Sequence, residues 1–372
     1  MIKQRFMIGN GDYKELEKYF VEHRPGSIFW VCGNSVSKLE IGRYFKELGE
    51  RLGMRIVHFS DFQPNPLYES VVKGTDIFLR ESCDMIAAVG GGSAMDVAKC
   101  IKLYACREAP EKYLNMEFLA VPTTAGTGSE ATRFAVIYKD GEKQSVTDEN
   151  CIPTAVYMDA MLLETLPVYQ KKSAMMDALC HAIEAYWSVH STEESRKDSE
   201  KAIRMILENH EAYISGEYAA GVNMLKAANL AGKAINIAQT TAGHAMCYKL
   251  TGLYSLAHGH AAALCVAKLW PYMLEHTSQC ADSRGIKYLH AVFRGLAEAM
   301  GAENEKSAAE RFQKLLDDLG LEAPVPEEEE FELLKKTVHP DRLKNHPICL
   351  EESDIDKLYH EILSGKHKET QI

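Results

Sequence analysis

The feature that most constrains the fold is a repeated pairing of a short apolar run with a helix-like segment in the first third of the chain. Helix-like segments at 38–51 and 68–81 separate runs of mostly apolar residues that are typical of buried strands. The four runs cover residues 27–32, 54–59, 84–89 and 117–122. Strands that alternate with helices predict a doubly wound, mainly parallel sheet, which binds ligands at the carboxyl ends of its strands.

A change of pattern near Leu166 and Pro167 indicates a second domain. Residues 170–320 show long helical periods with few strand-like runs. A chain of 372 residues is long enough for two domains, each with its own core. We therefore predict an α/β N-terminal domain over residues 1–165 and an all-α C-terminal domain over residues 166–372.

Charge and cysteine usage exclude several classes of partner. A net charge of −11 argues against nucleic acid, because binding a phosphate backbone needs a basic face. Charged residues interrupt every apolar stretch before the ~20 residues that a membrane span needs. The ten cysteines form no CxxC pair, which favours reduced thiols and a cytoplasmic protein.

The first glycine-rich turn follows the third predicted strand. Without Cβ atoms, Gly90, Gly91 and Gly92 let backbone N–H groups approach a phosphate. We expect Ser93 to N-cap the next helix, with Asp96 at its third position, so that the positive helix end faces the anion. A tight structural turn is the simpler explanation of this turn taken alone.

The second glycine-rich turn follows the fourth predicted strand and is rich in hydroxyl groups. Two such turns at successive strand ends favour a ligand with a pyrophosphate, and hence a dinucleotide-binding domain. The hydroxyl groups come from Thr123, Thr124, Thr127 and Ser129.

Two pairs of residues in the helical half have the spacing of metal ligands. Asp177 and His181 are four residues apart and share one helix face, although a simple ion pair would also explain them. On one unbroken helix His244 and His258 would lie roughly 21 Å apart, so they can share an ion only if the chain turns back between them, and we expect the break at Gly252, Tyr254-Ser255 and Gly259. One carboxylate and three imidazoles suit a divalent first-row ion and leave iron(II) and zinc both open.

A dinucleotide together with a divalent ion implies hydride transfer. The nicotinamide would carry the hydride, and the ion would act as a Lewis acid on a carbonyl or alkoxide oxygen. Because the two sets of residues lie in different domains, we expect the active site in the cleft between the domains.

The order and spacing of these motifs resemble those of the iron-containing (group III) alcohol dehydrogenase family over nearly the whole chain. The motifs are residues 90–99, 122–130 and 177–186, with His244 and His258-Gly259. The resemblance implies a dehydroquinate synthase-like architecture, an NAD(P)-dependent oxidoreductase of small aldehydes or primary alcohols, and a homodimer or larger assembly.

The same resemblance assigns roles to individual residues. Gly91, Gly92 and Ser93 would hold the pyrophosphate beside the three threonines, and Asn65 and Lys143 would line the cofactor site. The metal, most often iron(II) with zinc as the alternative, would be bound by Asp177, His181, His244 and His258.

The first departure from the family pattern concerns the cofactor. NAD-preferring members carry an acidic residue after the first strand, where this chain has Gly33. A carboxylate there would repel a 2′-phosphate, whereas Asn34 and Ser35 can donate hydrogen bonds to it. The pattern favours NADPH over NADH, unless Gly33 serves only as a turn residue.

The second departure is Tyr248, four residues after His244, where many members place another histidine. A phenol can hydrogen-bond a substrate oxygen, but it titrates near ~10 and is a poor proton shuttle at neutral pH. Proton delivery would then pass through a ribose hydroxyl and water, or through His260, which a packed structural histidine would also explain. We include Tyr248, His258 and His260 as candidate catalytic residues.

The runs around His244 and His258 are also similar to phosphonoacetaldehyde reductases of this family, with Lys249 and Arg133 as candidate cations for an anionic aldehyde. The alternatives are a general short-chain alcohol dehydrogenase and a glycerol dehydrogenase-like polyol enzyme. A lyase resembling dehydroquinate synthase would need a cluster of basic residues that this chain lacks near its histidines. A non-catalytic nucleotide-binding protein would have no reason to keep four ligands.

Overall fold

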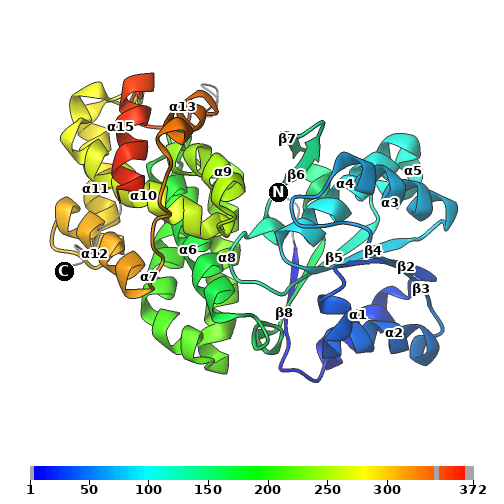
Figure 1. Ribbon diagram of the computed structural model, residues 1–372. Helices are drawn as coiled ribbons and strands as arrows, with labels where there is room; N and C mark the ends of the chain where they lie inside the picture. The colour runs from blue at the N-terminus through cyan, green and yellow to red at the C-terminus, as the bar shows by residue number, and fades with distance from the viewer. Residues whose placement is uncertain (1–3, 339–342, 365–372) are drawn as a thin grey trace, which may run out of the picture. The chain divides into compact units, whose positions relative to one another are not determined.

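The protein is described by a computed structural model that covers residues 4–338 and 343–364 (Figure 1). It divides into two compact units, Met1–Leu166 with Gly216–Gly232 and Pro167–Ser215 with Lys233–Ile372. The sequence predicts a single boundary between residues 165 and 166 and does not anticipate that Gly216–Gly232 packs with the first unit.

The first unit contains a six-stranded sheet in which every neighbouring pair of strands is parallel. The strand order is β1-β8-β5-β4-β2-β3. The predicted parallel α/β fold is confirmed, although β1 and β8 are not among the four strands that the sequence predicts. The strands are β1 (Arg5–Ile8), β2 (Ser27–Cys32), β3 (Arg55–Phe59), β4 (Met85–Gly90), β5 (Glu117–Pro122) and β8 (Ala155–Met158).

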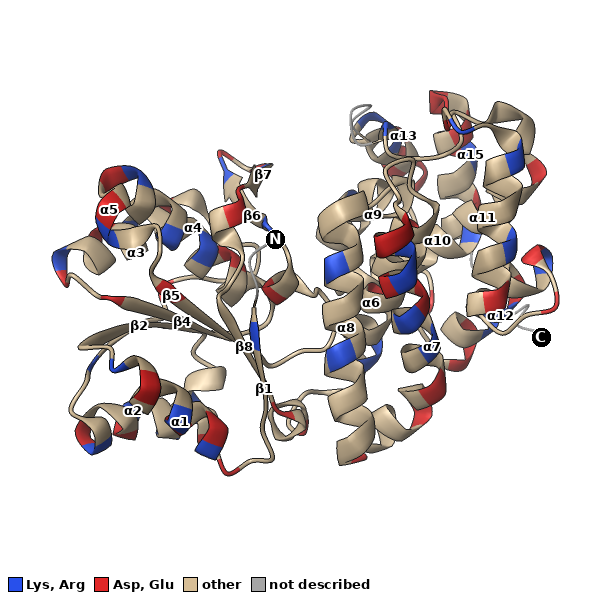
Figure 2. Ribbon diagram, turned by 180° about the vertical axis from the view of Figure 1, so that it is seen from behind, with Lys and Arg blue, Asp and Glu red and all other residues tan. Residues whose placement is uncertain are grey.

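Helices cover both faces of this sheet, which is why its central strands are mostly apolar. Every residue of β2 is buried, and Figure 2 shows no charged residue on β2 or β4. Trp30 stacks on Phe45 of α2, whereas Phe29 contacts Phe78 of α3 on the opposite face. Figure 1 shows α1 and α2 on one side of the sheet and α3 to α5 on the other. The helices are α1 (Lys14–His23), α2 (Glu40–Leu52), α3 (Tyr68–Arg80), α4 (Gly92–Glu108) and α5 (Pro110–Tyr113).

An antiparallel hairpin of β6 (Phe134–Lys139) and β7 (Glu142–Thr147) completes the elements of the α/β part. The backbone N–H of Tyr138 in β6 donates to the Pro66 carbonyl at 2.8 Å. Tyr138 also pairs with Lys143 across the hairpin. The hairpin therefore brings Lys143 and the loop of Asn65 into one neighbourhood.

The segment 216–232 joins the first unit through close contacts with the second glycine-rich turn. Gly128 has a φ of +58°, and a Cβ there would lie 2.6 Å from Gly232 Cα. Nearby, the Asn229 side chain donates to the Glu130 carboxylate at 3.1 Å. Two glycines facing each other allow backbone to pack on backbone, a contact that no local pattern predicts.

The second unit is helical, as predicted for this part of the chain. Its central helix α6 is buried from residue 175 to 187, and it packs against α7, α10 and α11. Among the described residues, no helix is long and apolar enough to cross a membrane. The helices from α6 onward are α6 (Val168–Trp187), α7 (Glu193–Ser215), α8 (Tyr218–Ala238), α9 (Ala242–Tyr254), α10 (His258–Glu275), α11 (Ile286–Ala299), α12 (Glu305–Asp318), α13 (Glu328–Lys336) and α15 (Glu352–Leu363).

Candidate functional site

The two glycine-rich turns lie side by side because the strands that precede them are neighbours. In the parallel register Gly90 pairs with Pro122, and the Thr123 N–H donates to the Gly90 carbonyl at 3.0 Å. Thr123 and Thr124 therefore follow β5 beside the glycines that follow β4. These turns form one carboxyl-terminal edge, where doubly wound sheets bind nucleotides.

The surroundings of the first turn leave little room for a Cβ atom. A Cβ on Gly91 would lie 3.3 Å from the Thr124 hydroxyl, and one on Gly92 would lie 3.1 Å from the Thr127 methyl group. The N-terminus of the 17-residue helix α4 opens directly at this turn. Bare backbone, neighbouring hydroxyls and a helix N-terminus fit a pyrophosphate. Gly91, Gly92, Thr124 and Thr127 thus form a cradle suited to a dinucleotide.

The prediction that Ser93 caps this helix is wrong. Helix α4 begins at Gly92 with Gly91 as its N-cap, which places Ser93 inside the first turn. Asp96, instead of capping, accepts a hydrogen bond from the Ser129 hydroxyl at 3.1 Å. Its half-buried position raises the pKa of Asp96 to about 6, and Lys99 partly opposes this shift. A contact between Asp96 and the cofactor stays a prediction.

A buried lysine that the sequence analysis does not single out connects helix α4 to the second glycine-rich turn. Lys99 is fully buried, and its ammonium group donates to the Ser129 hydroxyl at 2.9 Å and the Thr132 hydroxyl at 3.0 Å. The Phe134 carbonyl accepts a third bond at 2.7 Å. A buried charge must be paired or hydrogen-bonded, and this arrangement fixes the second turn against α4. The sequence feature that could have revealed this role is a lysine on a mostly apolar face of the helix.

The remaining predicted cofactor residues lie in the same unit. Asn65 has a left-handed φ of 57° in its Pro-Asn-Pro loop. Lys143 lies close enough to Asp96 to oppose the rise in the pKa of that carboxyl. Gly33 directly follows β2, Asn34 and Ser35 are exposed, and a Cβ on Gly33 would meet no atom within 4 Å.

The predicted metal ligands come from three helices of the second unit. Asp177 and His181 lie on α6, and His244 lies on α9. The left-handed Ser255, with φ 53°, ends α9, and His258 is the first residue of α10. The chain therefore turns back between His244 and His258, as predicted, with Ser255 at the turn.

Three of the four predicted ligands converge on one point. Asp177, His244 and His258 each offer a donor atom, and these atoms all lie within 4.8 Å of one another. Asp177 Oδ1 faces His244 Nε2 at 3.4 Å, and both atoms are buried without the geometry of a hydrogen bond. His181 lies against this group: its ring stacks on His244 at 4.4 Å, and its Nδ1 is 4.0 Å from Asp177 Oδ2.

The electrostatics of the group suit a divalent cation. Burial disfavours a charged Asp177, but His181, His244 and His258 hold the pKa of that carboxyl below its usual value. Burial likewise opposes a charge on His244, yet Glu184 and Asp177 raise the pKa of its imidazole to about 9. A metal ion binds the neutral form of an imidazole, so it would displace a proton from His244, and with all three imidazoles neutral the two buried carboxylates carry two negative charges for the ion to balance. The residues therefore fit the metal that the motif predicts.

Glu184 is a residue at this site that the sequence analysis missed. Its carboxylate is fully buried and contacts His244 Nδ1, while it also accepts bonds from the Thr241 N–H at 3.0 Å and the Thr241 hydroxyl at 2.7 Å. These contacts, against the opposing effect of burial, hold its pKa at about 2. With Nδ1 occupied, His244 presents Nε2 to Asp177. The missed signal was the helical spacing of residues 177, 181 and 184.

The two candidates for proton transfer occupy different positions. Tyr248 stacks parallel to His258, with ring centroids 5.6 Å apart and an interplanar angle of 11°. His260 is buried, and its Nδ1 lies 3.1 Å from the Tyr169 hydroxyl. Two residues along a helix turn the side chain to another face, so His260 does not join the group of Asp177, His244 and His258. Its part in a proton relay stays a prediction.

The buried His346 predicts that the stability of the fold depends on pH. The His346 ring packs edge-on to Trp187, and burial lowers its pKa to about 3. The unfolded chain binds a proton near the ordinary value of about 6.5, so stability is fully present above that pH and is lost as pH falls from there toward the folded pKa. We expect a loss of about 2 kcal/mol between pH 7 and pH 5.

Urea unfolding of the wild type and of His346→Leu at both pH values measures this contribution. In the leucine variant the part of the decline that belongs to His346 should vanish, while the declines caused by other groups remain. An identical decline in both proteins would show that His346 does not titrate in this range.

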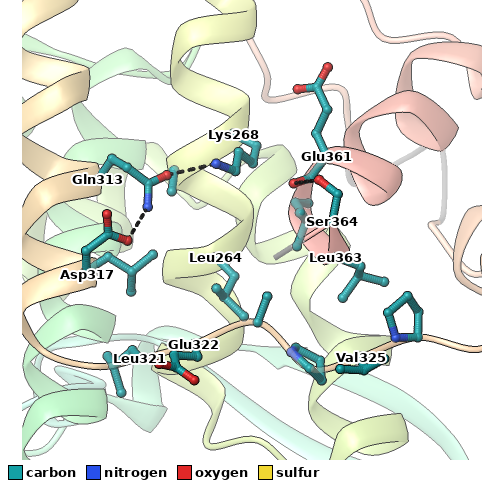
Figure 3. Close-up of a pocket in the computed structure, with 16 residues that line it drawn as sticks. Leu264, Lys268, Gln313, Asp317, Leu321, Glu322, Val325, Glu361, Leu363 and Ser364 are labelled. Carbon is teal, nitrogen blue, oxygen red and sulfur yellow. Dashed lines mark hydrogen bonds between the residues drawn. The ribbon is translucent and has the colours of Figure 1, made fainter. Parts of the chain in front are cut away.

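The second unit also holds a pocket of about 700 Å³ between α10, α12, residues 321–326 and the end of α15 (Figure 3). One wall carries a hydrogen-bonded row in which Lys268 donates to Gln313 at 3.0 Å and Gln313 donates to Asp317 at 2.9 Å. None of the described residues that line it belongs to the group of Asp177, His244 and His258. The pocket is therefore not the metal site.

Comparisons with known proteins agree with this geometry. Residues 3–160 match the family described as iron-containing alcohol dehydrogenase, and residues 172–363 match the C-terminal domain of the same family. The chain is 31% identical to aldehyde-alcohol dehydrogenase 2 of Entamoeba histolytica over 72% of its own length and 32% of that protein. It is 33% identical to the phosphonoacetaldehyde reductase of Streptomyces viridochromogenes over 64% of its own length and 65% of that protein.

Solved structures show the same fold. The iron-containing alcohol dehydrogenase of Thermococcus thioreducens superposes with a TM-score of 0.86 at 22% identity, covering 98% of this chain and all of that one. The two family matches together cover most of the 372 residues, and they include every predicted metal ligand and cofactor residue. The chain therefore belongs to the iron-containing alcohol dehydrogenase family.

Proposed function

We propose that this protein is a metal-dependent oxidoreductase that transfers hydride between NAD(P)H and a small aldehyde or primary alcohol. The observation that carries the proposal is the convergence of Asp177, His244 and His258 within 4.8 Å in a buried setting. Family membership adds support, because one domain of the family is matched on each side of residue 166.

The residues of the second unit would hold the ion and prepare the site for the substrate. Asp177, His181, His244 and His258 are the proposed ligands, with iron(II) as the expected ion and zinc as the alternative. When bound, the ion would supply Lewis acidity toward the carbonyl oxygen, and a nicotinamide would supply the hydride. The half-buried Tyr248 stands beside His258, where its phenol can hydrogen-bond a substrate oxygen.

The residues of the first unit would hold the dinucleotide. Gly91, Gly92 and Ser93 would lie along the pyrophosphate, beside the hydroxyls of Thr123, Thr124 and Thr127. Space at Gly33 and the lack of a carboxylate there favour NADPH, because nothing at this position repels a 2′-phosphate. Ten free cysteines agree with action in a reducing, cytoplasmic setting.

Phosphonoacetaldehyde is the proposed specific substrate. The support is a relative that is a phosphonoacetaldehyde reductase, together with Lys249 on α9 next to Tyr248. Lys249 is half-buried, and an ammonium group there can pair with a phosphonate. Arg133 is the weaker of the two candidate cations, since Glu149 already binds its guanidinium at 2.9 Å.

Reconstitution with a metal tests the proposal. Protein freed of metal and loaded anaerobically with iron(II) or zinc should oxidise NADPH in the presence of small aldehydes, with the largest kcat/KM for phosphonoacetaldehyde. His258→Ala should lose both bound metal and turnover, because it removes one of the converging donors. Inductively coupled plasma analysis reports the metal independently of activity.

The matched control is His210→Ala, which removes a histidine of helix α7 that is not a proposed ligand. It should keep its metal and its turnover. A folded wild-type protein that binds cofactor but holds no stoichiometric divalent ion would overturn the proposal. Equal kcat/KM for butanal and phosphonoacetaldehyde would overturn only the choice of substrate.

A further inference from the structure

We propose that Lys46 determines the preference for NADPH by pairing with the 2′-phosphate of the cofactor. This inference rests on the proposed function, because it places the adenosine ribose of that cofactor at the turn that follows β2. It concerns a side chain on helix α2 that no sequence motif marks.

Lys46 is held directly over the turn that contains Gly33. Within this turn the Ser37 N–H donates to the Gly33 carbonyl at 3.1 Å. The Lys46 ammonium donates to the Ser37 carbonyl at 3.0 Å, although the lysine lies nine residues further along the chain. The hydrogen bond fixes the side chain and leaves two N–H groups of the ammonium for another acceptor.

A glycine on α2 makes this position accessible to the lysine. A Cβ on Gly42 would lie 2.7 Å from Ser37 Cα, so the helix packs straight onto the turn. Lys46 is one helical turn after Gly42 and therefore lies over the same face. Packing at Gly42 thus sets the direction of the Lys46 side chain.

The charges around this turn favour an anion. Among the described residues, Lys46 forms no ion pair with a carboxylate. His58 of β3 lies with Nε2 3.3 Å from the Cys32 carbonyl, and burial together with the positive charge of Lys46 lowers the pKa of its imidazole. The exposed Lys38 on the same turn adds a further positive charge. A carboxylate at position 33 would offset the charge of Lys46, whereas glycine leaves the turn open, with no atom within 4 Å of where a Cβ would lie.

The 2′-phosphate is the group that distinguishes the two cofactors. An ammonium forms a strong charge-assisted hydrogen bond with a phosphate, and it gains much less from the ribose hydroxyl of NADH. A residue that only stabilises the turn would change the affinity for both cofactors by the same factor. A larger loss of affinity for NADPH than for NADH therefore distinguishes binding of the 2′-phosphate from stabilisation of the turn.

The test measures binding of NADPH, NADH, 2′,5′-ADP and 5′-AMP to the full-length protein by calorimetry, which needs no turnover. Lys46→Gln should weaken the binding of NADPH and 2′,5′-ADP about tenfold or more. It should weaken the binding of NADH and 5′-AMP by less than about twofold. Lys46→Arg, which keeps the charge, should restore most of the loss. Gly33→Asp should lower affinity for NADPH in the same way, by placing a carboxylate beside Lys46.

Lys18→Gln, which removes an exposed charge from helix α1 of the same unit, is the matched control and should leave all four affinities unchanged. Equal losses for NADPH and NADH in a folded Lys46→Gln protein would overturn the inference, since Lys46 would then only brace the turn. A wild type that binds NADH as tightly as NADPH would also overturn it, while the proposed reductase activity would stand. Failure to bind any of the four probes would overturn the proposed function as well.

Discussion

Gly259→Ala is expected to disrupt the proposed metal site and destabilise the second unit. Gly259 follows His258 on α10, and the two helices α6 and α10 meet at this glycine. A Cβ would collide with the Ser173 carbonyl oxygen and lie 2.5 Å from Asp177 Cβ. Because most of the obstruction is backbone, the helices must separate, and such overpacking costs about 1–3 kcal/mol or more.

The same separation moves Asp177 away from His258. Since both are proposed ligands, we expect a loss of metal affinity together with a lower unfolding temperature. Competition with a chelator measures metal affinity, and thermal unfolding with and without metal measures stability. The stabilisation that metal confers on the wild type should be small or absent in the variant.

Gly252→Ala provides the matched control for this substitution. Gly252 lies in helix α9, its φ is not positive, and a Cβ there would meet no atom within 4 Å. Alanine favours a helix by up to about 1 kcal/mol over glycine, so this change should be neutral or stabilising. If Gly259→Ala bound metal as tightly as Gly252→Ala, the close approach of α6 and α10 would not be needed for the site.

Glu184→Gln should lower metal affinity without removing a ligand. The Glu184 carboxylate contacts His244 Nδ1 and therefore keeps the proton on that nitrogen, so that Nε2 is available. The carboxylate uses one oxygen for His244 Nδ1 and the other for the backbone N–H groups of Thr241 and His244. An amide has a single, weaker acceptor oxygen and an NH₂ group that cannot accept, so it can serve only one of these two sets of donors. Partners of this kind contribute about 10–100-fold to metal affinity.

A cobalt(II) titration checks this expectation, because its visible spectrum reports ligand geometry independently of turnover. The spectrum of Glu184→Gln should change in shape as well as in the concentration at half-saturation. Glu184→Asp, which retains the charge, should recover part of the affinity, and Glu200→Gln on the exposed face of α7 should have no effect. A spectrum and affinity equal to those of the wild type would show that Glu184 does not position His244.

Much of the fold was readable from local patterns. The apolar runs at 27–32 and 117–122 coincide with β2 and β5, and the periodic segment around Asp177 lies in α6. Such periodicity reflects which side of a segment is buried, so it survives in the sequence. The edge strand β1 and its neighbour β8 were missed, because four residues carry too little periodicity to distinguish a strand from a loop.

Local chemistry also misled the prediction of one helix start. Ser93 followed by Asp96 suggests an N-cap, but α4 begins at Gly92. The Asp96 carboxylate instead accepts a hydrogen bond from Ser129 of the second glycine-rich turn. The buried Lys99 holds Ser129 in place by a further hydrogen bond. A hydrogen-bond partner 33 residues away outweighs the local signal.

For the proposed metal site, the sequence alone determined the chemical type of the candidate ligands and their helical spacing. It also required the chain to turn back between His244 and His258. Only the tertiary structure decided that Gly259 lets α10 touch α6, that Glu184 faces His244, and that His260 turns toward Tyr169. The reason is physical: residue type and period are set within a few neighbours, whereas the meeting of three donor atoms depends on how helices far apart in the chain pack against one another.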